Sequence, residues 1–152
     1  MANVFDVAAH ILRRQGRMSA MKLQKLIYYC QAWSLVWDGK QLFPEKIQAW
    51  VNGPVVYELF KAHRGQFEVT PHSLTTQGST KNLNQEQKET INAVLRFYGD
   101  KSPQWLSDLT HMEAPWKKAR RGLAPDMPAS PTIPLDSMAT YYERLSPPKS
   151  RR

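Results

Sequence analysis

The sequence predicts a mainly α fold, a single compact helical domain of about six or seven helices with at most one or two very short strands around residues 47–52 and 67–69. In most segments the apolar residues recur about every 3.6 residues, which places them on one face of a helix. Capping residues precede these segments and glycines follow them. Only the two short stretches favour strands. With 152 residues, the chain has the length of one domain and can bury one core.

Two helices are predicted in the N-terminal part of the chain. Asn3 can cap the first and Gly16 can end it, and its apolar face consists of Val4, Val7, Ala8, Ile11 and Leu12. The second runs from the N-cap Ser19 to Gly39, with an apolar stripe of Leu23, Leu26, Ile27, Cys30, Trp33 and Trp37. Because its second half is apolar on most sides, we expect this helix at the centre of the fold, with Gln24 and Gln31 on its polar edge.

A rigid turn is predicted at residues 52–54, between the first short strand and a third helix over residues 55–63. Proline at the first position of a helix already has the required φ and lacks only an N–H that would be unpaired there, so Pro54 favours a helix start. Gly53 allows a backbone conformation or a close approach that a Cβ would hinder. We therefore expect a corner that docks the third helix against the long Trp-rich helix.

The C-terminal half shows further helix signals. Asn84 and Gln87 have the spacing of a capping box, before a helix that Gly99 ends. Pro103 and Pro115 each fit the start of a short helix, and residues 135–145 form a last one. The expected organisation is a core of residues 1–122, a Pro-rich connector and short C-terminal helix packing on the core over residues 123–146, and a basic disordered tail over residues 147–152.

The positive charge is concentrated in three segments. The net charge is +8, yet residues 10–25 carry +5, residues 117–121 carry +4 and residues 143–152 carry +3. Such segments attract nucleic acid or an acidic protein, although a charge run can also be only a solvated surface. The sequence shows no helix-turn-helix, so specific DNA binding is not expected. With no apolar run of about 18 residues, no signal peptide and the single cysteine Cys30, the protein is expected to be cytoplasmic, without a membrane partner.

No residue pattern indicates an enzyme or a metal centre. The histidines at positions 10, 63, 72 and 111 lack the spacing of metal ligands, so we expect no metal and no cofactor. Cys30 lies on the apolar stripe of the central helix, where a thiolate is disfavoured. His111 and Glu113 are expected to satisfy buried backbone groups at a helix–helix corner rather than to catalyse. The sequence therefore predicts a binding module with no catalytic residues.

Two segments resemble the signatures of a known family. Residues 21–65, MKLQKLIYYCQAWSLVWDGKQLFPEKIQAWVNGPVVYELFKAHRG, resemble the first signature of the Panacea domain, the SocA-like antitoxin domain of phage-associated GepA-like proteins. Residues 102–120, SPQWLSDLTHMEAPWKKAR, resemble the second, with the core LTHMEAPW at residues 109–116. The order and spacing of KLQKL, GPV and THMEAPW make the combination specific. The resemblance covers most of residues 3–122.

The resemblance implies an antitoxin that neutralises a cognate protein toxin, encoded by a neighbouring gene, through direct protein–protein contact. A proteolytic adaptor that delivers the toxin to a Clp-type protease is an alternative from the same family, and a basic nucleic-acid-binding regulator is a further alternative from the charge. A homodimer and a heterotetramer with the toxin both stay open.

Two sets of site residues follow from the resemblance and the turns. The structural motif comprises Lys22, Leu23, Lys25, Leu26, Gly53, Pro54, Thr110, His111, Glu113, Pro115 and Trp116. Aromatic side chains beside rigid turns make good anchors for a protein partner, and basic ones raise the rate of association with an acidic face. The expected toxin-binding residues are Trp50, Asn52, Tyr57, Trp116, Lys117 and Arg120.

Overall fold

The computed structural model describes residues 2–73 and 77–145. Its helices are α1 (Val4–Gln15), α2 (Ala20–Trp37), α3 (Tyr57–His63), α4 (Gln85–Tyr98), α5 (Pro103–Met112), α6 (Ala114–Ala119) and α7 (Leu135–Leu145), with a 3₁₀ turn η1 (Thr80–Asn82). Its strands are β1 (Met18–Ser19), β2 (Ile47–Trp50), β3 (Gly53–Val56) and β4 (Glu68–Val69). The predicted mainly α fold is confirmed, whereas the predicted basic tail of residues 147–152 lies outside the described residues.

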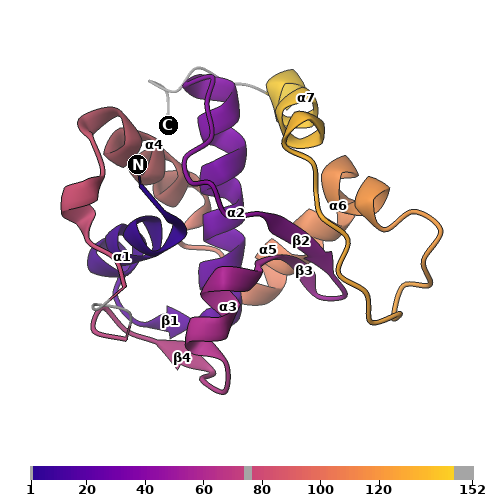
Figure 1. Cartoon of the computed structure of the whole chain (residues 1–152), viewed down its shortest axis with the longest axis horizontal. Coiled ribbons are helices and arrows are strands. Elements are labelled where there is room, and N and C mark those ends of the chain that lie inside the picture. Colours follow the sequence, from indigo (N-terminus) through magenta and orange to yellow (C-terminus); the bar gives the residue numbers. More distant parts are fainter. Residues whose placement is uncertain (1, 74–76, 146–152) are drawn as a thin grey trace.

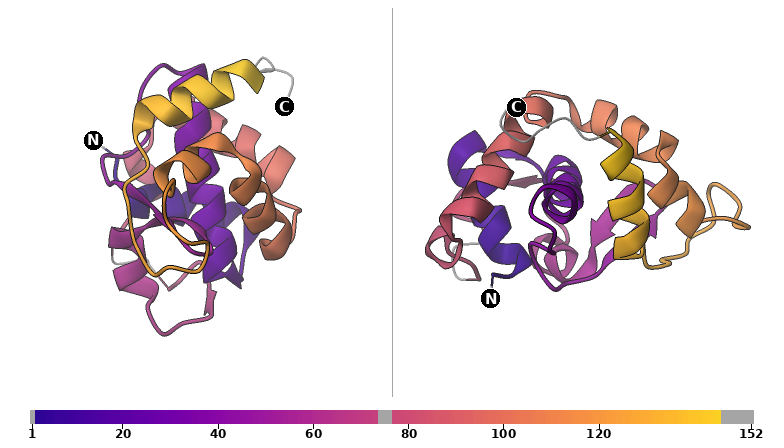
Figure 2. Two further views of the ribbon diagram at one scale, coloured as in Figure 1. Left: turned by 90° about the vertical axis from the view of Figure 1, so that its right-hand side faces the viewer. Right: turned by 90° about the horizontal axis from the view of Figure 1, so that it is seen from above.

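Helix α2 is the centre of the fold, as its apolar surface predicts. It packs against α4, α7, α5 and strand β3. In Figure 1 it crosses the middle of the molecule, and the view from above in Figure 2 shows it end-on, with α1 and α4 on one side and α7 on the other. Tyr29 and Cys30 at the middle of the helix are 0% exposed. Because neighbouring elements cover the helix on several sides, its second half has apolar residues around most of its circumference.

The prediction that Gln24 and Gln31 form a polar edge is wrong. Both side chains are buried, at 3% and 0% exposure. Gln31 accepts a hydrogen bond from the Leu42 N–H (2.6 Å) and donates to the Phe43 carbonyl (2.8 Å). An amide offers both a donor and an acceptor, so it can pair with backbone as a strand would. Gln31 thereby fixes the loop after α2 against the helix.

The prediction of a helix from residue 55 is also wrong at its start. Pro54 lies within β3, which pairs antiparallel with β2, and α3 begins only at Tyr57. Pro54 stands opposite Ala49, whose N–H donates instead to the Pro131 carbonyl (2.7 Å). The proline nitrogen, which has no hydrogen to donate, therefore faces no acceptor on β2. This is why proline is tolerated at this position of the strand.

The two predicted strands both exist, and each has a partner that the sequence did not reveal. Strand β2 pairs with β3 in a hairpin, and β4 pairs with β1 immediately before α2. The connector after α6 adds a further pairing along β2, since the Ile133 N–H donates to the Ile47 carbonyl (2.8 Å). It then leads into α7, whose Met138 and Tyr142 are buried. None of the helices in the described part of the chain is long and apolar enough to cross a membrane.

Candidate functional site

The turn of the β2–β3 hairpin is held by side chains of the second signature. Four of them lie within hydrogen-bond distance of four consecutive backbone carbonyls of the turn. The pairs are Ser107 Oγ with Asn52 O (2.9 Å), His111 Nε2 with Val51 O (2.7 Å), Trp116 Nε1 with Trp50 O (2.8 Å) and Arg120 Nη1 with Ala49 O (2.8 Å). Loop carbonyls would otherwise face water or stay unpaired. The spacing of the signature along α5 and α6 thus matches one side chain to each residue of the turn.

The opposite edge of the hairpin is held by the first signature. Gln24 Oε1 accepts from the Val56 N–H (2.9 Å), and Gln24 Nε2 donates to the Val56 carbonyl (3.3 Å). One residue on, Lys25 Nζ donates to the Pro54 carbonyl (3.0 Å). Helix α2 therefore supplies the bonds that a neighbouring strand would give and covers the edge of β3. The two signatures meet at this hairpin.

Gly53 is required where the hairpin turns over α2. Its φ is 121°, a conformation that residues with a Cβ rarely adopt. A Cβ there would lie 2.6 Å from Lys25 Cε and 3.1 Å from Thr110 Oγ1, closer than unstrained contacts allow. Thr110 is itself buried, with its hydroxyl donating to the Ser107 carbonyl (2.7 Å). The expected close approach at Gly53 is thus present, between the hairpin backbone and the side chains of both signatures.

His111 and Glu113 have different roles. His111 contacts backbone as expected, since its two ring nitrogens face the carbonyls of Ser107 (2.6 Å) and Val51 (2.7 Å). The expectation that Glu113 satisfies backbone groups is wrong. Its Oε1 accepts hydrogen bonds from the hydroxyls of Tyr29 (2.7 Å) and Tyr142 (2.6 Å), which joins the corner between α5 and α6 to α2 and α7. Burial raises the pKa of this carboxyl, and the two hydroxyl bonds oppose that rise.

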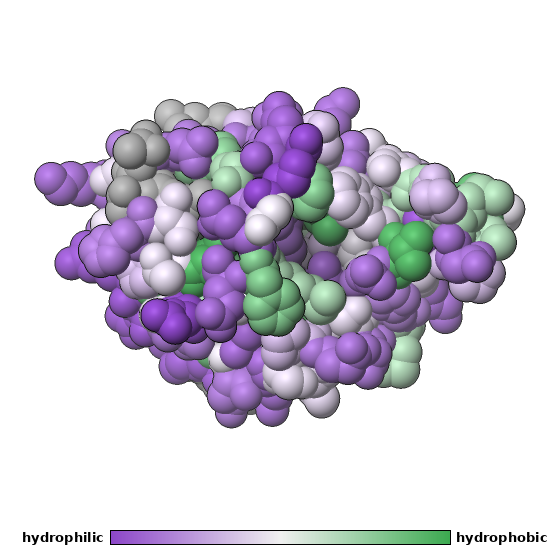
Figure 3. Space-filling model, turned by 90° about the horizontal axis from the view of Figure 1, so that it is seen from below, coloured by the Kyte–Doolittle hydropathy of each residue, from purple (hydrophilic) through white to green (hydrophobic). Residues whose placement is uncertain are grey.

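A cavity of about 590 Å³ opens beside the hairpin. The space-filling view from below shows this face of the molecule, with hydrophobic side chains around a hollow in its middle (Figure 3). The walls come from the start of α2, the hairpin, the α3 segment and the connector, and include Met21, Gln24, Lys25, Trp50, Asn52, Val55, Phe60, His63, Arg64, Phe67 and Pro128. Most of these side chains are apolar, and the charged ones in the wall are basic.

Lys25 is the unusual group in this wall. The residue is only 1% exposed, and burial lowers the pKa of its ammonium from 10.5 to about 7. Among the described residues no carboxylate forms an ion pair with it, and its hydrogen bond goes to the Pro54 carbonyl. A buried cation that lacks a counter-charge and lines a cavity is typical of a functional site.

The expected toxin-binding residues divide into two groups. Trp50 and Asn52 line the cavity, and Tyr57 lies next to it, 38% exposed and with its ring centroid 6.4 Å from that of Trp50. Trp116 is half-buried and holds the turn, while Lys117 on the same helix is exposed.

Arg120 belongs to the interior. It is 5% exposed, and its guanidinium donates to the carbonyls of Ala49, Met127 and Ala129. These bonds hold the connector against the hairpin. Because Arg120 is buried and bonded to three backbone carbonyls, its guanidinium is not presented to a partner as the sequence led us to expect.

Several cavity residues were missed from the sequence. Phe60, His63 and Arg64 come from α3 and its end, and Phe67 follows shortly after, 82% exposed. A phenylalanine in a polar stretch was the one signal that could have pointed to this wall. In the described residues no group of three or more His, Cys, Asp or Glu is placed to hold a metal ion. Burial raises the pKa of the Cys30 thiol, which keeps it in its unreactive form.

Comparison with known proteins gives one match. The family model described as "Antitoxin SocA-like, Panacea domain" matches residues 23–117, from the start of α2 into α6. Searches of curated proteins and of solved structures found no match. The matched span contains the hairpin and nearly all of the signature side chains that hold it, and it covers more than half of the 152 residues. The chain therefore belongs to the SocA-like antitoxin family and carries a Panacea domain.

Proposed function

We propose that this protein is the antitoxin of a toxin–antitoxin system, and that it neutralises a cognate protein toxin, the product of a neighbouring gene, by direct binding in the cytoplasm. Family membership supports the antitoxin role. Binding itself requires no chemistry, in keeping with a site built from hydrogen bonds to backbone rather than from a nucleophile and a base.

The rigid hairpin beside an open cavity is the observation that carries this proposal. Side chains of α5 and α6 fix the turn, and side chains of α2 fix the edge of β3. A surface that is already ordered loses little conformational freedom on binding, so more of the contact energy appears as affinity. The hairpin holds Trp50 and Asn52 in place at the cavity, with Tyr57 at its end.

Exposed apolar side chains around the cavity support a protein partner. Met21 is 39% exposed and Phe67 is 82% exposed, and both line the cavity. Tyr57 nearby is 38% exposed. Apolar patches with a polar surround mark interaction sites, and aromatic residues are enriched at their centres.

The basic segments fit electrostatic attraction better than nucleic-acid readout. Two of their charges, Lys25 and Arg120, are buried and bonded to backbone carbonyls. Lys117 and Lys118 are exposed on the neighbouring helix α6. Surface charges of this kind raise the rate of association with an acidic partner more than the affinity.

Co-expression with the product of the neighbouring open reading frame tests the proposal. We expect that product to arrest growth alone and to be harmless together with this protein. Tyr57→Ala should weaken rescue, because it removes an exposed anchor, whereas Phe97→Ala serves as a matched control on α4, where the ring is 55% exposed. A neighbour that is harmless on its own would refute the antitoxin role. A Tyr57→Ala protein that no longer folds would show that this ring belongs to the core.

A further inference from the structure

The cavity beside the hairpin has a one-sided charge. Lys25, His63 and Arg64 line it, and no aspartate or glutamate of the described residues does. Arg64 is exposed, with its guanidinium carbon 5.5 Å from the centre of the Phe60 ring, so it stands where the cavity opens. Lys25 is shielded from solvent. A negatively charged group that enters would meet a cation at the opening and a second one in the wall.

Lys25 is costly for the free protein. An ammonium has three N–H donors, and the described residues give this one a single acceptor, the Pro54 carbonyl at 3.0 Å. Burial of a charge without a counter-charge destabilises a protein, which is why the pKa of Lys25 falls to about 7. Gln24, one residue earlier, satisfies both backbone groups of Val56 with a neutral amide. A neutral side chain at position 25 could therefore satisfy the edge of β3 equally well. A positive charge at this position becomes useful when an anion enters the cavity.

The apolar wall restricts what can carry that anion. Trp50, Val55 and Phe60 line the cavity along with the basic groups, and Phe67 and Pro128 line it from two further segments of the chain. Apolar surface from four different segments can contact residues both before and after an inserted side chain. A terminal carboxylate has neighbours on one side only, so the arrangement suits an acidic side chain within a chain segment.

We propose that the cavity receives an aspartate or glutamate side chain of the toxin, whose carboxylate pairs with Lys25 while the adjacent apolar residues of the toxin pack against Trp50 and Phe60. This assignment rests on the proposed antitoxin function and names the chemistry that its partner must present. The pair stabilises the complex in two ways. The two charges attract each other, and the carboxylate supplies a counter-charge for Lys25, for which the described residues of the free antitoxin provide none.

To test this assignment, we would measure how tightly the Lys25→Met protein binds the product of the neighbouring gene. Methionine keeps the volume of the stem and removes the charge. We expect the dissociation constant to rise at least about 30-fold, the typical effect of breaking a buried charge pair. Lys22→Met, in the same motif but half-buried and outside the cavity wall, is the matched control and should change affinity by less than about threefold.

A double-mutant cycle separates pairing from a structural role of Lys25. Each surface aspartate and glutamate of the toxin is replaced by its amide, and binding is measured to the natural antitoxin and to Lys25→Met. Replacing the acidic residue that pairs with Lys25 should weaken binding to the natural antitoxin but cause no further loss of affinity for Lys25→Met. Additive losses for every acidic residue would overturn the assignment. So would unchanged binding by a folded Lys25→Met protein, which leaves the antitoxin function standing. If binding is lost only when the C-terminus of the toxin is extended, the group in the cavity is the terminal carboxylate of the toxin. That result would refute the proposed aspartate or glutamate side chain.

A probe without the toxin keeps the two proposals distinguishable. Phenylacetate combines a carboxylate with an apolar ring, and phenylacetamide has the same shape without the charge. In two-dimensional NMR titrations of the whole protein, we expect millimolar phenylacetate to shift the backbone amide signals of residues 50–53 and 55–57, and phenylacetamide to shift them much less. Lys25→Met should abolish the difference between the two. Equal shifts by both compounds would show an apolar cavity without a carboxylate site, whatever the toxin does.

Discussion

Replacing Lys25 with methionine should change how the free energy of unfolding depends on pH. Burial lowers the pKa of Lys25 to about 7 in the native state, and the unfolded chain keeps the ordinary value of 10.5. Between these two values the unfolded state binds more protons at this site than the native state. The free energy of unfolding of the natural protein therefore rises with pH in this window, by about 1.4 kcal/mol per pH unit. Below pH 7 both states are protonated and the destabilisation is complete.

The difference in the free energy of unfolding between the natural protein and Lys25→Met isolates the contribution of Lys25. Burial lowers the pKa values of Lys22, His10 and His63 too. Lys22 and His10 are common to both proteins, and His63, whose pKa is lowered by burial and also by Lys25, titrates below the window. The buried tyrosines and Cys30 act only above about pH 9. From pH 7.5 to 9, the natural protein should gain about 2 kcal/mol relative to Lys25→Met. Loss of the bond to the Pro54 carbonyl adds a constant offset of about 1–3 kcal/mol.

Urea unfolding at several pH values, with the slope m checked for constancy, provides the measurement. The exposed Lys117→Met serves as the control and should follow the pH dependence of the natural protein. Parallel curves for the natural protein and Lys25→Met would refute the reasoning, because they would mean that Lys25 stays charged in the native state and has a counter-charge.

Three further outcomes are expected. Gly53→Ala should lose about 1–3 kcal/mol more than Gly39→Ala in urea unfolding, because the φ of 121° at Gly53 lies outside the left-handed α region that Gly39 occupies at 68°, and only Gly53 has a neighbour, Lys25, against a new Cβ; equal losses would mean that neither the conformation nor the close approach at Gly53 requires glycine. Burial raises the pKa of Glu113, so the contribution of this carboxyl to stability should fall as pH rises from about 4.5 to its raised native pKa, and the stability of the natural protein relative to Glu113→Gln should fall over that window; a constant difference between the two proteins would contradict the burial argument. If the protein masks its toxin, the toxin half-life in cells should not shorten when the antitoxin is present; a shorter half-life that depends on a Clp-type protease would instead support the adaptor role.

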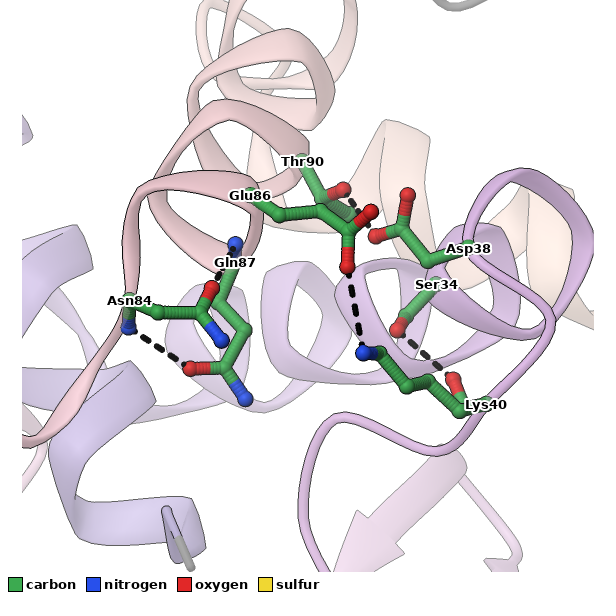
Figure 4. Close-up of polar contacts among 7 residues, drawn as sticks. All are labelled: Ser34, Asp38, Lys40, Asn84, Glu86, Gln87 and Thr90. Atoms are coloured by element: carbon green, nitrogen blue, oxygen red, sulfur yellow. Dashed lines mark hydrogen bonds and ion pairs between the residues drawn. The ribbon is translucent and has the colours of Figure 1, made fainter.

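The helices could be predicted because their signals are local. Asn3, Ser19 and Asn84 cap α1, α2 and α4 as expected, and Asn84 and Gln87 exchange hydrogen bonds in a capping box (Figure 4). Such bonds join residues three positions apart, so the sequence contains both partners side by side. The same figure shows a contact of the other kind, the hydroxyl of Thr90 donating to Asp38 at 2.5 Å, which links α4 to the end of α2. Nothing near either residue in sequence predicts it.

Strand β3 could not be predicted for a related reason. Val55, Val56, Leu59 and Phe60 have the spacing of a helix face, and Pro54 before them suits a helix start. The first two residues form a strand nevertheless, because β2 pairs with them on one side and Gln24 binds Val56 on the other. Tertiary partners outweigh local propensity where a segment is this short.

The candidate site shows the same division. The chain by itself established the family through its two signatures, the order of its helices and the rigid turn at Gly53. Only the folded structure brought Ser107, His111, Trp116 and Arg120 to four consecutive carbonyls of that turn. Only burial turned Lys25 from one lysine of a basic segment into a cavity-wall cation with which no carboxylate of residues 2–73 and 77–145 pairs. Periodicity and capping act over a few residues and are visible in sequence, whereas desolvation and pairing of backbone edges depend on which distant segments come into contact.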